Sequence, residues 1–311
     1  MNVYSIENKT IMIERELDTC LGDLLCTKDI AIGKVVEIDK NIIEVKLFTN
    51  IFSFKIGENE DYFFQKKNDY FFVEYFNNIL TPNGSLGEIK WETEFEFISI
   101  LDEGCQVSSE DVIGYIKHNN FKYPILVPGG IVEGALIHTS PTKVTYEQPI
   151  NHVSYQGRLY PINAYQYNEF KLNKNPIDDD NKIVLVNREF DNEILKVLSN
   201  FEIVIHVSSR LPQSYIQNSI TKVREYFSKA GVSNVQVVGY NDYPCFNEEY
   251  SKLIVEKVLN NVKQMILRGI NVLIFLEDFD IQLAHDLFQL EGEYKTKGGK
   301  QTILRIVELS N

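Results

Sequence analysis

The sequence is poor in positive charge, in long apolar runs and in paired cysteines. Its 31 Lys and Arg residues against 44 Asp and Glu residues give a formal net charge of −13 at pH 7. Because a nucleic-acid surface needs clustered Lys and Arg to displace counterions, we expect no nucleic-acid partner. The longest apolar run, Val272 to Leu276, is far shorter than the roughly 20 residues of a membrane helix, so we expect no direct membrane insertion.

The cysteines and histidines show no ligand spacing. The four cysteines include no C-x-x-C pair, which argues against a zinc ribbon or a disulfide framework. The first residues, Met1 to Glu7, lack the basic region and apolar core of a signal peptide, so we expect a cytoplasmic location. No metal cage or Ser-His-Asp arrangement is indicated for the five histidines, and we expect structural or surface roles for them: His118, His138, His152, His206 and His285.

The chain nevertheless has the composition of a packed protein with more than one domain. It has 311 residues, of which 44% are hydrophobic and 12% aromatic. Short alternating segments such as Ile43 to Leu47, separated by turn signals, predict an N-terminal β-barrel over residues 1–74. Closely spaced Gly and Pro residues predict a second β module over residues 84–157.

The pattern changes in residues 158–311, where short apolar runs alternate with helical stripes. The runs resemble buried parallel strands and lie at residues 183–186, 203–207, 235–238 and 272–276. One stripe, Ile254, Val258, Val262 and Met265, ends before Arg268-Gly269, a typical helix stop. The expected fold class is therefore α+β multidomain, with a mostly parallel sheet in the third part.

The order of these parts resembles the catalytic A subunit of V-type and archaeal-type rotary ATPases. Trp91, Asp111 to Gly114 and Ile125 to Gly130 follow the turns and strands of that family's inserted β module. Leu21 to Leu24 and Lys55 to Glu58 resemble its N-terminal barrel. The resemblance implies a RecA-like nucleotide-binding fold in the third part of the chain.

The residues that bind phosphate in such folds are replaced here. A phosphate loop needs G-x-x-x-x-G-K-[ST], but the matching stretch, Val186 to Glu193, has no glycine and carries three acidic residues. Arg188 is the candidate substitute for the lysine, or an ordinary loop residue. Where the family has Gly-Glu-Arg, this chain has Ser208-Ser209-Arg210, so the water-activating glutamate is absent and Arg210 is a candidate phosphate contact or a surface charge.

Three carboxylates follow the apolar strand that ends near Leu276. Glu277, Asp278 and Asp280 are the hard oxygen ligands that Mg²⁺ prefers, and they are either a metal site or the solvated relic of one. No counterpart of the family's helical C-terminal domain precedes Asn311, so we expect a C-terminally truncated relative.

Two functional hypotheses remain, beside the third possibility of an evolutionary remnant that has no selected role. The first is a catalytically inactive A-subunit-like protein that needs no cofactor and acts by binding protein subunits, either those of a V-type ATPase peripheral to a membrane or further copies of itself. The alternative is an atypical subunit that binds or hydrolyses ATP with Mg²⁺ at a reduced site made by Arg188, Arg210, Glu277, Asp278 and Asp280.

Overall fold

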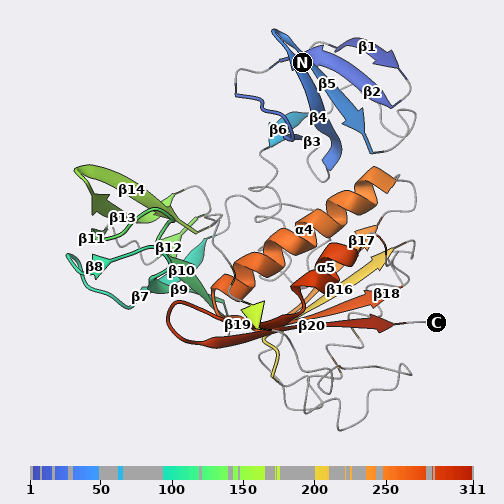
Figure 1. The fold of residues 1–311 in the computed structure, drawn as a ribbon. Helices are drawn as coiled ribbons and strands as arrows, with labels where there is room; N and C mark the ends of the chain where they lie inside the picture. The colour runs from blue at the N-terminus through green and yellow to red at the C-terminus, as the bar shows by residue number, and fades with distance from the viewer. Residues whose placement is uncertain are drawn as a thin grey trace.

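The structure is a computed structural model that describes part of the chain. The described residues are 3–7, 9–15, 18–26, 31–48, 62–65, 94–118, 121–138, 143–145, 148–164, 172, 174–175, 200–209, 221, 225, 236–242, 248–277, 282 and 284–309. These residues are mostly in strands, with few helices (Figure 1).

The N-terminal part is an antiparallel sheet of six strands in the order β1-β2-β5-β4-β3-β6. The strands are β1 (Val3–Glu7), β2 (Thr10–Glu14), β3 (Leu24–Cys26), β4 (Ala31–Asp39), β5 (Ile42–Leu47) and β6 (Phe63–Gln65). Ile11, Ile13, Ile43 and Val45 alternate into a buried cluster on one face. Closure into a barrel needs a hydrogen-bonded seam between the end strands. The described residues show no pairing of β1 with β6, so the expected barrel appears here as an open sheet.

Two further sheets of four strands form the middle of the chain. One has the order β10-β9-β7-β12 and the other β14-β13-β11-β8. Their strands are β7 (Phe95–Ser99), β8 (Gln106–Val107), β9 (Val112–His118), β10 (Phe121–Leu126), β11 (Gly134–His138), β12 (Lys143–Val144), β13 (Pro149–Tyr155) and β14 (Arg158–Asn163). A tight turn with positive φ at Gln156 and Gly157 joins β13 to β14, so the second sheet continues past residue 157. We refer to the two sheets together as the β module.

The last part is a mixed sheet in the order β15-β19-β20-β18-β16-β17. Its parallel strands are β16 (Ile203–Ser209), β17 (Gln236–Asp242), β18 (Val272–Glu277) and β20 (Gln301–Leu309). On the far side of β20, β19 (Gly292–Lys295) and β15 (Lys174–Asn175) are antiparallel. We call this the C-terminal sheet. The sequence predicted parallel pairing for the apolar runs of this sheet, but it did not predict the antiparallel strands β19 and β15 at its edge.

Helix α4 (Glu248–Leu267) and the short helix α5 (His285–Leu290) lie on the same side of the C-terminal sheet (Figure 1). The predicted apolar stripe of α4 is confirmed, because Ile254, Val258, Val262 and Met265 are all buried. The predicted stop is also confirmed. Gly269 has a φ of 75°, a left-handed conformation that suits glycine after a helix end, and its N–H donates to the carbonyl of Ile266 at 3.0 Å.

Helix α4 contacts all three parts of the fold. Near its start, the rings of Tyr250 and Phe48 lie 5.6 Å apart, next to the N-terminal sheet. Beyond its end, Arg268 donates from Nε to the carbonyl of Pro124 in the β module at 3.2 Å. The core formed by this helix, the β module and the C-terminal sheet is one continuous cluster of buried side chains.

Candidate functional site

The strand order of the C-terminal sheet reverses between β16 and β18. After β16 the chain goes to β17 on one side, and it then crosses to β18 on the other side of β16. In open α/β sheets, ligands bind outside the carboxyl ends of the strands at such a reversal. Ser208 and Glu277, which are paired across β16 and β18, lie at these ends.

A buried pair of ionisable side chains occupies this position. The Nε2 atom of His206 lies 2.7 Å from the Oε2 atom of Glu277, and the two side chains are 1% and 2% exposed. Ile203, Ile205 and Val207 pack into the core that contains α4. Since side chains alternate along a strand, His206 lies on the opposite face of the sheet, together with Glu277.

The pair is suited to a structural role. A hydrogen bond between imidazole and carboxylate satisfies two groups that would be costly to bury alone. The other ring nitrogen of His206, Nδ1, is buried and has no hydrogen-bond partner within the described ranges. The proton position on the ring is set by the hydrogen-bond network, so a carboxylate at Nε2 favours a proton on that nitrogen.

The structure gives a position to one of the five residues predicted for a nucleotide or metal site. Glu277 is described, and its buried carboxylate contacts His206 on the face of the sheet opposite α4. Arg188, Arg210, Asp278 and Asp280 lie outside the described residues, as does the stretch that replaces the phosphate loop. Among the residues with described positions, no group of three or more His, Cys, Asp or Glu side chains is arranged to hold a metal ion.

Sequence reasoning missed the partnership of His206 and Glu277. It treated His206 as an isolated structural histidine and Glu277 as part of an acidic cluster. The available signal was the placement of one ionisable residue in each of two otherwise apolar runs that were both expected in one parallel sheet. The contact itself could not be predicted without the register between β16 and β18, because the two residues are 71 positions apart.

A second feature is the solvent-facing side of the N-terminal sheet. Met12 and Ile42 are 40% and 38% exposed, whereas their neighbours Ile13 and Ile43 are fully buried on the other side. Strand register places Met12 opposite Glu44 and Ile42 opposite Glu14, and Glu37 is also opposite Glu44. We call Met12, Glu14, Glu37, Ile42 and Glu44 the outer face of the N-terminal sheet.

The outer face mixes apolar and acidic side chains. Further along β5 the same side of the sheet carries Lys46 opposite Lys34, and Lys46 forms an ion pair with Glu249 of α4 at 3.5 Å. Exposed apolar side chains next to acidic ones fit a protein partner that offers apolar contacts and basic groups.

No protein-family model matches this chain, and no curated protein sequence matches it either. None of the helices in the described part of the chain is long and apolar enough to cross a membrane.

Proposed function

We propose that this chain is a non-catalytic binding protein of the rotary-ATPase A-subunit type. In this proposal the C-terminal sheet is a RecA-like core without nucleotide chemistry, and the outer face of the N-terminal sheet docks onto other protein subunits. The partners are ring subunits of a V-type ATPase or, failing these, further copies of the chain. The observation that carries the proposal is the acidic and apolar outer face.

The position of Glu277 supports the non-catalytic part of this proposal. A carboxylate that holds Mg²⁺ for phosphoryl transfer must point its oxygens at the metal and its waters. Glu277 is 2% exposed, and one of its oxygens is taken by His206. This arrangement favours the hypothesis of a relic over that of a working cation site at the end of β18.

The docking half of the proposal is tested by sedimentation with purified A-type and B-type ring subunits. The wild-type chain should form a complex, and Met12→Lys with Ile42→Lys should abolish it by placing two positive charges on the outer face. The matched control, Val132→Lys with Leu159→Lys, makes the same change at two exposed apolar positions of the β module and should retain the complex. Failure of the wild-type chain to associate with the ring subunits or with itself would overturn the proposal.

The non-catalytic half is tested separately by thermal unfolding with Mg-ATP. A ligand present at one hundred times its Kd stabilises a protein by about 2.7 kcal/mol, which a melting curve resolves easily. We expect no change of the melting temperature at millimolar Mg-ATP. A clear rise that disappears in the double variant Arg188→Ala and Arg210→Ala would support the alternative, a reduced ATP site.

A further inference from the structure

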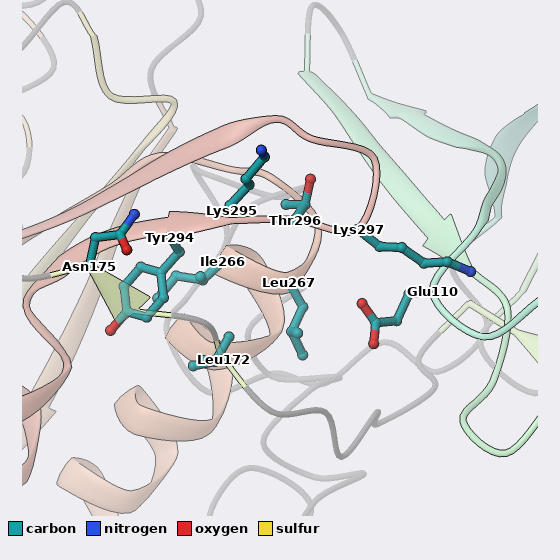
Figure 2. A pocket seen from close by; sticks show the side chains of 9 residues that line it. All are labelled: Glu110, Leu172, Asn175, Ile266, Leu267, Tyr294, Lys295, Thr296 and Lys297. Carbon is teal, nitrogen blue, oxygen red and sulfur yellow. The ribbon is translucent and has the colours of Figure 1, made fainter.

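A cavity lies where the β module meets the C-terminal sheet. Its volume is about 450 Å³, which is within the range of small-molecule sites. Its lining comes from the β8–β9 connection, the end of α4, β15 with Leu172 before it, and β19 with the turn after it (Figure 2). Sites at such junctions between parts of a fold are common, because the two parts supply different chemistry to one ligand.

One part of the cavity is apolar. Leu172, Ile266 and Leu267 line it together with the ring of Tyr294 (Figure 2). The Tyr294 hydroxyl donates to the carbonyl of Leu290, so this side chain offers its ring rather than its hydroxyl to a ligand. A flat or aliphatic body of a few carbon atoms would bury apolar area against these side chains.

The carboxylate of Glu110 is the charged group directed toward this apolar part (Figure 2). The backbone of Glu110 has a φ of 72°, an unusual conformation for a residue with a side chain, and its N–H donates to the carbonyl of Val127 at 3.0 Å. The tight turn therefore sets the direction in which the Cα–Cβ bond of Glu110 leaves the backbone. Burial raises the pKa of Glu110, the charge of Lys297 opposes this, and Asp111 adds to it.

The ammonium group of Lys297, which also lines the cavity, is paired elsewhere. Lys297 forms an ion pair with Asp111 at 2.9 Å and donates to the carbonyl of Ser109 at 2.8 Å. In Figure 2 its ammonium group points away from the cavity, and Lys295 points away from Glu110. Glu110 has no ion pair or side-chain hydrogen bond within the described part of the chain.

We propose that this cavity is a binding site for a small organic amine, with the ammonium group on Glu110 and an apolar body against Leu267 and Tyr294. An ammonium that donates to a carboxylate makes a charge-assisted hydrogen bond, which is stronger than a neutral one. The aromatic ring of Tyr294 can add a favourable contact with a cation or with an apolar ring. The net charge of −13 attracts cations to the protein as a whole.

The test uses phenethylamine as the probe, measured by isothermal titration and by ligand-observed NMR on the full chain. We expect phenethylamine to bind saturably to the wild-type protein. Phenethyl alcohol, which has the same body without the charge, should bind about tenfold more weakly, since it loses a hydrogen bond between charged groups. Hydrocinnamate, which carries the opposite charge, should not bind measurably.

The matching substitution is Glu110→Gln, which should weaken phenethylamine about tenfold while leaving the alcohol unchanged. Glu103→Gln removes the same charge at an exposed position of the β module and should leave both affinities as they are. The proposal is overturned if phenethylamine shows no saturable binding, if hydrocinnamate binds as well as the amine, or if Glu110→Gln and Glu103→Gln behave alike. The comparison of the three probes on the wild-type chain holds even if Glu110→Gln does not fold.

Discussion

The guanidinium of Arg268 lies over the ring of Tyr123, with its central carbon 4.8 Å from the ring centroid. Arg268 follows helix α4, and Tyr123 belongs to strand β10 of the β module, so this contact joins the two parts. Both side chains are buried, at 5% and 1% exposed. The Nη1 atom of Arg268 also donates to the backbone carbonyl and to the side-chain oxygen of Gln264, at 2.9 and 2.8 Å. The charge is thus hydrogen-bonded on one side and stacked on the other.

Removing Arg268 should therefore destabilise the whole fold. Arg268→Ala loses a buried cation–π contact and hydrogen bonds to three acceptors, and we expect a loss of about 3 kcal/mol in the free energy of unfolding. Arg268→Lys keeps the charge but loses the planar guanidinium group. Its free energy of unfolding should therefore lie between those of the wild type and Arg268→Ala. Urea unfolding followed by circular dichroism measures both.

The control for this comparison is Lys143→Ala, which removes an exposed cation paired with Glu94 and should leave the unfolding midpoint unchanged. If Arg268→Ala behaved like Lys143→Ala, the contact between Arg268 and Tyr123 would contribute nothing to stability.

A second prediction concerns the buried pair of His206 and Glu277. Breaking a buried pair leaves one ionisable group without compensation and typically costs about 3–5 kcal/mol, whereas replacing both groups by apolar ones is often neutral. We expect His206→Leu alone to fall in that range, and the double variant His206→Leu with Glu277→Met to regain most of the loss. A double-mutant cycle, measured by urea unfolding, gives the interaction free energy between His206 and Glu277. Additive effects of the two substitutions would contradict a direct interaction between these side chains.

The fold could be predicted from the sequence where one segment determines its own structure. The stripe of α4 and its end at Arg268-Gly269 are local signals, because 3.6-residue periodicity and a left-handed glycine act within a few residues. The apolar runs of β16 and β18 likewise indicate parallel strands. Closure of the N-terminal sheet depends on pairing between distant segments, which periodicity does not determine. The antiparallel strand β19 belongs to a local hairpin, in which Lys295 lies opposite Gln301 of β20, and this hairpin was not predicted.

For the candidate site too, local features could be predicted and contacts between separate segments could not. The sequence could identify Glu277 as an acidic residue at a strand end, but its partner is set by the register between β16 and β18. The cavity beside Glu110 was not predicted at all. It is built from four separate segments, and none of them contains a motif on its own.

A third prediction is a loss of stability at alkaline pH. Burial raises the pKa of Tyr123 to about 12 from its ordinary value of 10.0, although Arg268 opposes the shift. Between these two values the unfolded chain releases a proton that the folded chain keeps, so stability falls as the pH rises from about 10 to about 12. The full loss corresponds to about 3 kcal/mol. Urea unfolding at several pH values should show this fall in the wild type and a smaller one in Tyr123→Phe; equal slopes would contradict it.

A final prediction tests packing inside the β module, at Gly114 of strand β9. A Cβ atom built there would lie 2.4 Å from the carbonyl oxygen of Ile98 and 2.5 Å from the ring of Phe97, on the paired strand β7. Since the contact with Ile98 is to backbone, Gly114→Ala should force the two strands apart and cost about 2 kcal/mol in the free energy of unfolding.

Gly298 is the matched control, because a Cβ atom added there has no heavy atom within 4 Å. Gly298→Ala should be neutral or stabilising by up to about 1 kcal/mol, since it restricts the unfolded chain. Both variants are measured by thermal unfolding and by amide hydrogen exchange of β7 and β9. These measurements separate a clash in the folded protein from an effect on the unfolded chain, because faster exchange is expected in Gly114→Ala alone. Unchanged exchange and an unchanged melting temperature in Gly114→Ala would show that β7 and β9 are not paired as closely as this register requires.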